Sequence, residues 1–302
     1  MAGPGAGTSW RSSTPSPPET ATEVRAIEDT VVLVTGSTDG LGRAVAGRLA
    51  GAGATVLIHG RDSDKLASTA HELRSASGND RIRSYLADFS SLDEVRGMAH
   101  EVEAENHRLH VLINNAGVGS GRPAGTTRQE SGDGYELRFA VNHLAGFVLT
   151  MRLLPLLRRS APARVVNVAS AGQYPIDFDD VMLEADYDGA RAYRQSKLAQ
   201  IMFGFDLAHR VPAGEVTVSS LHPATFMPTK IVLEQHGQSV DSLEEGVEAT
   251  LRLAVATDLD GVTGRYFNRQ AEARADEQAY DAAARRRLWD LSAALTGEPA
   301  VV

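Results

Sequence analysis

The chain has 302 residues, of which 42% are hydrophobic, and a formal net charge of −9. This length suits one large domain or two small ones, and the apolar fraction is enough to build a full core. The acidic balance argues against nucleic-acid binding, and the absence of cysteine excludes disulfides, thiol catalysis and thiolate metal sites. The nine histidines are scattered without the spacing of metal ligands, so no metal site is expected.

The first 27 residues are predicted to be a disordered tail, followed by a single domain over residues 28–302. Gly, Pro, Ser and Thr dominate this tail, which cannot bury enough surface to offset its ordering entropy. The longest apolar stretch, Ala145–Leu157, is short for a membrane span and contains Arg152 and Pro155, so it is interpreted as a buried helix. Without a predicted secretory signal or membrane anchor, a cytoplasmic protein is expected.

Beyond the tail, short β-branched runs alternate with amphipathic segments. The predicted strands are 30–35, 54–58, 81–86, 111–113, 164–168, 215–221 and 264–267. The first predicted helix follows the turn at 36–42 and ends at about residue 52. The others cover 62–75, 92–105, 135–159, 190–210, 243–255 and a last segment around 288–295. This alternation predicts an α/β protein with a single-domain Rossmann fold, built on a doubly wound parallel sheet of seven strands.

A glycine-rich turn, Thr35-Gly-Ser-Thr-Asp-Gly-Leu-Gly42, joins the first strand to the first helix. Its glycines allow backbone N–H groups to approach a pyrophosphate, and the helix N-terminus favours negative charge. The alternative is a tight turn without a ligand. Because the turn follows a strand and opens a helix, it predicts a dinucleotide site at Gly36, Ser37, Thr38, Asp39, Gly40, Leu41 and Gly42.

The second strand ends in His59-Gly-Arg-Asp62. A site for NAD usually places a carboxylate here for the ribose 2′-hydroxyl, whereas an arginine accommodates the 2′-phosphate of NADP. Gly60 carries no carboxylate, and Arg61 can pair with a phosphate. The alternative is a solvated loop arginine next to Asp62 as a helix cap. The pattern favours NADP(H) over NAD(H).

Tyr193 and Lys197 are four residues apart in a chain that has only three lysines. Positions i and i+4 share a helix face, so the ammonium can approach the phenol. A nearby cation lowers the pKa of a tyrosine and makes it a usable general acid or base. Taken alone, the pair is equally compatible with an accidental arrangement on an exposed helix.

With these motifs in order, residues 28–267 resemble the short-chain dehydrogenase/reductase family. Asn142, Ser170, Tyr193 and Lys197 match its catalytic residues. The resemblance also implies cofactor contacts from residues at the ends of strands, namely Asp88 at the adenine, Asn115, Ala116 and Gly117 after the fourth strand, and Pro223 and Thr225 after the sixth. The alternatives are a buried polar Asn142, a strand-end turn at Ser170 and a helix cap at Asp88.

Within the family, the chain resembles the retinol-dehydrogenase-like branch. The insertion Tyr174–Glu184, with Tyr187 before the catalytic helix, and the segments Leu221–Pro223 and Thr263–Phe267 carry this resemblance. The chain departs from the usual family pattern at two places. Pro223-Ala224 stands after the sixth strand where Pro-Gly is usual, and Thr229 lies one residue later than in the common pattern. These departures put the loop over the nicotinamide in doubt.

The resemblance implies a role for each residue of the catalytic set. Tyr193 exchanges a proton with the substrate oxygen, and Ser170 orients that oxygen. Lys197 lowers the pKa of Tyr193, and both contact the cofactor, Lys197 at the nicotinamide ribose. Asn142 holds a water that relays protons from Lys197. The cofactor supplies the hydride.

The substrate is expected over the carboxyl ends of the strands. The predicted wall comes from residues 173–186 and 225–237, with contacts from Ser170, Gln173, Tyr174, Tyr193, Phe226 and Met227. This apolar lining predicts a hydrophobic ketone, aldehyde or alcohol, unless these side chains only pack the loop onto the core. A non-catalytic NADP sensor and a nicotinamide-using epimerase or dehydratase are the alternatives. The family is often oligomeric, so the resemblance predicts a homodimer or homotetramer.

Overall fold

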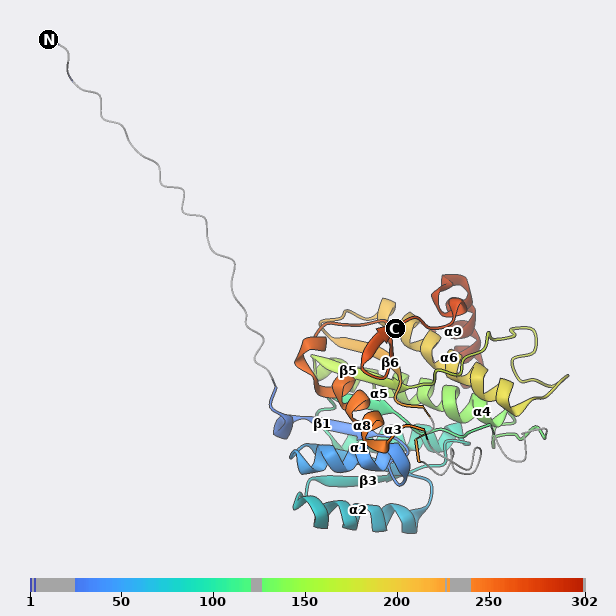
Figure 1. Cartoon of the computed structure of the whole chain (residues 1–302), viewed down its shortest axis with the longest axis horizontal. Coiled ribbons are helices and arrows are strands. Elements are labelled where there is room, and N and C mark those ends of the chain that lie inside the picture. Colours follow the sequence, from blue (N-terminus) through green and yellow to red (C-terminus); the bar gives the residue numbers. More distant parts are fainter. Residues whose placement is uncertain (2, 4–24, 121–126, 226, 229–239, 301–302) are drawn as a thin grey trace.

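A computed structural model of the protein describes residues 1, 3, 25–120, 127–225, 227–228 and 240–300. In these residues, eight strands form one sheet in the order β3-β2-β1-β4-β5-β6-β7-β8. Figure 1 shows this sheet with helices packed along it. The strands are β1 (Val31–Val34), β2 (Thr55–Gly60), β3 (Ile82–Leu86), β4 (Val111–Asn114), β5 (Ala163–Val168), β6 (Val216–His222), β7 (Arg265–Asn268) and β8 (Ala271–Ala273).

The seven predicted strands are all present and pair in parallel. The sheet also contains an eighth strand, β8, which pairs antiparallel with β7. The sequence prediction of seven strands is therefore one short. Strand β8 is Ala-Glu-Ala and largely exposed, so it has neither the β-branched residues nor the alternation that indicate a strand.

Helices cover both faces of the sheet because its strands are apolar on both sides. One core cluster contains Leu33 and Leu57 and the inner faces of α3 (Leu92–Glu105), α5 (Ala145–Arg159) and α6 (Gly189–Arg210). The other contains Val32 and Ile58 and the inner faces of α1 (Gly40–Gly51), α2 (Ser63–Ser77) and α8 (Leu243–Val255). Alternate residues of β1 and β2 thus enter opposite layers, as strand geometry requires. A last helix, α9 (Ala282–Thr296), packs against α6 (Figure 1).

The long helix predicted over residues 135–159 contains a π-helical turn near its start. A short helix, α4 (Leu137–Phe139), passes into a π-helical turn, η2 (Ala140–Leu144), before α5 begins. Together they form a continuous 23-residue helix, Leu137–Arg159, which is long and apolar enough to cross a membrane. The expectation that this segment is too short is therefore wrong. However, 78% of its most apolar window is buried inside the fold, as for a core helix.

The strand order reverses at β1, which lies between β2 and β4. In open α/β sheets, ligands bind at such a switch point, outside the carboxyl ends of the strands. Most of the predicted tail lies outside the described residues. Its last part is described, and there Arg25 donates hydrogen bonds to the carbonyl groups of Ser160 and Pro162, at 3.2 and 3.0 Å.

Candidate active site

The glycine-rich turn joins β1 to α1 at the switch point. Gly36 and Gly40 have positive φ angles of 63° and 50°, which favour glycine. A Cβ atom on Gly42 would collide with the carbonyl oxygen of Gly36 and with Asn115 Nδ2. Leu41 is buried in the core, and Asp39 caps α1 by accepting a hydrogen bond from Gly40 N at 2.8 Å. The sequence therefore specifies a turn at the start of a helix in which the glycines leave the backbone uncovered by side chains.

A buried histidine that the sequence analysis did not assign to the site supports this turn. His59 Nδ1 accepts a hydrogen bond from Gly36 N at 2.9 Å, and Nε2 lies 3.0 Å from the carbonyl oxygen of Ala87. Ser37 N donates to the His59 carbonyl group at 2.9 Å. Burial lowers the pKa of His59 to about 4, so the ring is neutral at physiological pH. The only sequence signal was its position at the end of the second strand.

An exposed arginine, Arg61, follows the end of β2. Arg61 is exposed and makes no hydrogen bond or ion pair with any other residue that the structure describes. A Cβ atom on Gly60 would lie 2.5 Å from Thr38 Cγ2, so there is little room for an acidic side chain at this position. Asp62 caps α2 through a 3.0 Å bond from Lys65 N. After the neighbouring strand β3, Asp88 Oδ1 accepts a 2.8 Å bond from Ser90 N and closes the turn.

The segment after β4 is bonded to the glycine-rich turn. Asn115 Nδ2 donates to the carbonyl oxygens of Thr35 and Gly36 at 2.8 and 3.2 Å. The backbone N–H groups of Asn115 and Ala116 both donate to Thr35 Oγ1 at 2.9 Å. The two segments that the resemblance assigns to the cofactor are therefore held as one unit.

Ser170, Tyr193, Lys197 and Asn142 converge at the carboxyl ends of β4 and β5. Ser170 follows β5, and its side chain lies close enough to the Tyr193 phenol on α6 to lower the pKa of that phenol. Lys197 Nζ lies 6.0 Å from the centre of the Tyr193 ring. It donates to the carbonyl oxygen of Val168 at 2.8 Å and to Gln200 Oε1 at 3.3 Å. Gln200 lies three residues beyond Lys197 on the same buried helix face and was not predicted from the sequence.

Burial shifts the pKa values of both Tyr193 and Lys197. Burial raises the pKa of Tyr193, and the hydrogen bond with Ser170 is what opposes this rise. Burial also lowers the pKa of Lys197 to about 8. The hydrogen bonds of Lys197 Nζ go to Val168 and Gln200 rather than to Tyr193, and the expected lowering of the Tyr193 pKa by Lys197 stays a prediction.

Asn142 lies in the π-helical turn η2, and such turns are frequent at functional sites. Its Nδ2 group donates to the carbonyl oxygen of Val118 at 3.1 Å and to Ser196 Oγ at 2.9 Å, and Oδ1 accepts from Val118 N at 2.7 Å. A Cβ atom on Gly117 would lie 3.0 Å from Asn142 Oδ1 and 3.6 Å from Lys197 Nζ. The missing side chain of Gly117 thus leaves a space between Asn142 and Lys197.

The predicted substrate contacts differ in their exposure and in their bonds to the rest of the protein. The amide of Gln173 is bonded on both sides to the protein, by Nε2 to the Ser170 carbonyl at 3.0 Å and by Oε1 to Asp276 N at 2.7 Å. Tyr174 is 46% exposed. Met227 is buried in the core next to Gly246, as the packing alternative predicts, and Phe226 lies outside the described residues.

Hydrogen bonds between Thr225 and Asp241 hold the base of the loop after β6. Thr225 N donates to Asp241 Oδ2 at 2.6 Å, and Asp241 N donates to the Thr225 carbonyl at 2.9 Å. Thr225 Oγ1 also lies 3.1 Å from His222 Nε2, and Pro223 is buried between them. The positions assigned to the nicotinamide are thus held at the carboxyl end of β6.

A buried polar cluster links three segments around the site. Arg138 Nη1 donates to the Tyr187 hydroxyl at 2.7 Å and lies 3.4 Å from Glu136 Oε1. The same guanidinium donates to the carbonyl groups of Gly119 and Ser120 at 3.1 and 3.2 Å. Burial raises the pKa of Glu136, and Arg138 opposes the rise. This cluster, which sequence motifs did not reveal, ties the segment after β4 to the insertion before α6.

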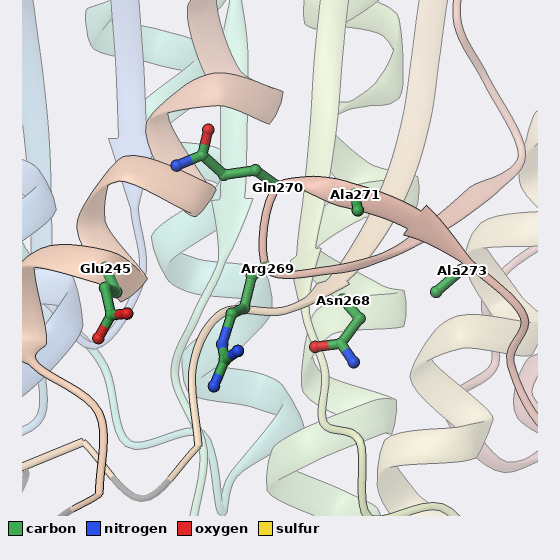
Figure 2. Close-up of a pocket in the computed structure, with 6 residues that line it drawn as sticks. All are labelled: Glu245, Asn268, Arg269, Gln270, Ala271 and Ala273. Atoms are coloured by element: carbon green, nitrogen blue, oxygen red, sulfur yellow. The ribbon is translucent and has the colours of Figure 1, made fainter.

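A separate hollow of about 530 Å³ lies at the turn between β7 and β8 (Figure 2). It is lined by Glu245, Asn268, Arg269, Gln270, Ala271 and Ala273. None of these residues belongs to the glycine-rich turn or to the catalytic set.

The residues present fit a dinucleotide. The bare backbone of the turn at residues 36–42 can receive a pyrophosphate, and Arg61 can receive a phosphate on the adenosine ribose. The space beside Gly117 opens toward Lys197 and Asn142. In the described residues no group of three or more His, Cys, Asp and Glu side chains could hold a metal ion.

The fold and this arrangement define a nicotinamide-dependent α/β oxidoreductase, and comparison with known proteins gives the family. The model of the short chain dehydrogenase family matches residues 30–238. The chain is 35% identical to mouse retinol dehydrogenase 13, covering 88% of this chain and 83% of that protein. It is 37% identical to mouse retinol dehydrogenase 14, covering 88% and 85%.

Solved structures of other proteins have a similar fold. A crystal structure of an uncharacterised protein from Mycobacterium paratuberculosis superposes with a TM-score of 0.71 at 26% identity, covering 94% of this chain and 99% of that one. An active-site complex of Pseudomonas aeruginosa RhlG with NADP gives a TM-score of 0.65 at 29% identity, covering 81% and 97%. The chain belongs to the short-chain dehydrogenase/reductase family and to its retinol-dehydrogenase-like branch. It is an oxidoreductase that acts on CH–OH and C=O groups.

Proposed function

We propose that the protein is an NADP(H)-dependent oxidoreductase that interconverts a hydrophobic aldehyde or ketone with its alcohol. The observation that carries the reaction is the meeting of the Ser170 side chain and the Tyr193 phenol at the carboxyl edge of the sheet, with buried Lys197 Nζ 6.0 Å from the centre of the Tyr193 ring. The name of the retinol dehydrogenases suggests retinal and retinol as the first substrate pair to test.

In the reductive direction, Tyr193 gives its phenolic proton to the carbonyl oxygen, and Ser170 donates a hydrogen bond to the same oxygen. The bound cofactor supplies the hydride to the carbonyl carbon, so that one hydride and one proton convert C=O to CH–OH. Lys197 holds a positive charge next to the space beside Gly117, and Asn142 lines the opposite side of that space. In the oxidative direction, Tyr193 accepts the proton of the alcohol.

The preference for NADP(H) rests on Arg61, which is exposed and has no partner within the described residues. The complex of RhlG with NADP supports the choice. The test is a fluorescence titration of NADPH and NADH with the wild type, Arg61→Ala and Arg286→Ala. Arg286 is a matched control because it is also an exposed arginine without a partner in the described part of the chain, but on α9.

Loss of a charge-assisted bond of about 1.5–3 kcal/mol should weaken NADPH binding by roughly 10- to 100-fold in Arg61→Ala. NADH binding, and both affinities of Arg286→Ala, should remain as in the wild type. Equal affinities for the two cofactors in the wild type would contradict the preference.

Measurements of turnover test the role of Tyr193 in the proposed reaction. Tyr193→Phe should bind NADPH normally and reduce retinal or an aliphatic aldehyde at least about 100-fold more slowly than the wild type. Near-normal turnover of this variant would refute the role of Tyr193. NADPH binding without turnover of any carbonyl by the wild type would favour a non-catalytic sensor. The cytoplasmic location and a homodimer or homotetramer remain predictions, to be tested by cell fractionation and light scattering.

A further inference from the structure

The chain beyond residue 238, where the match to the family model ends, folds back onto the loop that carries Ser170. The carbonyl oxygen of Ser170 accepts a hydrogen bond from the Tyr266 hydroxyl at 3.0 Å. Tyr266 belongs to β7 and is only 3% exposed, so its hydroxyl is held in a fixed position by the core around its ring. Gln173 Nε2 donates to the same carbonyl oxygen at 3.0 Å.

The far end of the same loop is held by the segment after β8. Ile176 N donates to Gln278 Oε1 at 2.6 Å, and Gln278 Nε2 donates to the Ile176 carbonyl at 3.0 Å. The side-chain amide of Gln278 thus pairs with a peptide group as a neighbouring strand would. Asp276 N donates to Gln173 Oε1 at 2.7 Å, which adds a third connection between the two segments.

These bonds matter for the Ser170 hydroxyl because Ser170 lies in a loop and not in a strand or helix. The carbonyl carbon of Ser170 is bonded directly to its Cα atom, so a carbonyl group held by two hydrogen bonds restricts the movement of the Cα and Cβ atoms that carry the hydroxyl. Within the loop, Ser170 Oγ accepts a local bond from Gly172 N at 3.0 Å. A displacement of about 1 Å at a reacting group can cost roughly 100-fold in rate.

We propose that Tyr266 is a positioning residue for Ser170, and that the segment from Tyr266 to Gln278 holds the serine loop, residues 170–176, in its reactive geometry. The inference rests on the proposed function, because it assigns Ser170 to the substrate oxygen. Tyr266 itself touches neither the substrate nor the cofactor in this scheme. It acts through the carbonyl group of Ser170.

The test compares Tyr266→Phe with Tyr85→Phe. Tyr85 is an equally buried tyrosine, 2% exposed, whose hydroxyl donates to Glu105 Oε2 at 2.9 Å and accepts from Asn106 Nδ2 at 2.8 Å. It lies in β3, at the opposite end of the sheet from β7. Both variants remove one buried hydrogen-bonded hydroxyl, so they should lose similar stability.

In Tyr266→Phe, kcat for carbonyl reduction should fall about tenfold while the Kd for NADPH stays within twofold of the wild-type value. Tyr85→Phe should keep both constants. Hydrogen–deuterium exchange supplies a readout that needs no turnover, because amides of residues 169–178 should exchange faster in Tyr266→Phe and in Gln278→Ala but not in Tyr85→Phe.

If the wild type reduces no carbonyl, the proposed function fails and the exchange measurement alone decides whether Tyr266 holds the loop. Where the wild type is active, an unchanged kcat in Tyr266→Phe would overturn the proposal. So would an unchanged exchange rate over residues 169–178, or the same losses in Tyr85→Phe.

Discussion

Acid should weaken the fold through three buried neutral histidines, of which His59 bears directly on the cofactor turn. Burial lowers the pKa values of His59 and His110 from 6.5 to about 4 and that of His143 to about 3. The unfolded chain therefore binds more protons than the folded chain below pH 6.5. The stability from these histidines is complete above pH 6.5 and is lost as the pH falls toward 4.

The expected loss of unfolding free energy follows from the shifts in the histidine pKa values. One pKa unit corresponds to about 1.4 kcal/mol, so the two most deeply buried rings, His59 and His143, each lower the free energy of unfolding by about 2 kcal/mol between pH 7 and pH 5. Two such losses are a large part of the whole stability of many domains, about 5–15 kcal/mol. Protonated His59 also loses the acceptor that binds Gly36 N, so cofactor affinity should fall in the same pH range.

The assay is urea unfolding at pH 7 and pH 5 for the wild type, His59→Asn and His71→Asn. Asparagine can keep an acceptor near the position of Nδ1 but cannot be protonated, so the pH-dependent loss should shrink by about 2 kcal/mol in His59→Asn. His71 is exposed, and its replacement should leave the loss unchanged. Comparing variants removes the opposite contribution of Glu136, whose pKa is raised by burial. Identical pH dependence in His59→Asn and the wild type would refute the argument.

Two further predictions use the space beside Lys197 and the buried polar cluster. Gly117→Ala should weaken NADPH binding without unfolding the protein, because its Cβ would fill the space beside Asn142 Oδ1; Gly97→Ala, an exposed control with no atom within 4 Å of the new Cβ, should bind NADPH normally in the same titration. Arg138→Met should cost about 3–5 kcal/mol of unfolding free energy by leaving the Glu136 carboxylate buried and unpaired, and adding Glu136→Gln should recover part of it. Additive losses in the double variant, measured by urea unfolding, would contradict this coupling.

Much of the fold was predictable because its signals are local. Continuous apolar strands such as β1 and β5, and helices such as α3 and α8, follow directly from the apolar pattern and start at capping serines or acidic residues. The bounds of α3 and α8 agree with the prediction at both ends. Strand β8 and the π-helical turn η2 were missed, since neither a three-residue exposed strand nor an extra residue in a helical turn changes the sequence pattern.

The sequence by itself determined the family motifs, namely the glycine-rich turn, Ser170 and the pair Tyr193 and Lys197, because their spacing along one strand, turn or helix is a local property. Only the tertiary structure decided what surrounds them. His59, Tyr266 and Gln278 reach the turn and the serine loop through hydrogen bonds between residues 23, 96 and 102 positions apart. Desolvation also set the pKa values of Tyr193 and Lys197, and burial depends on elements from the whole chain packing together.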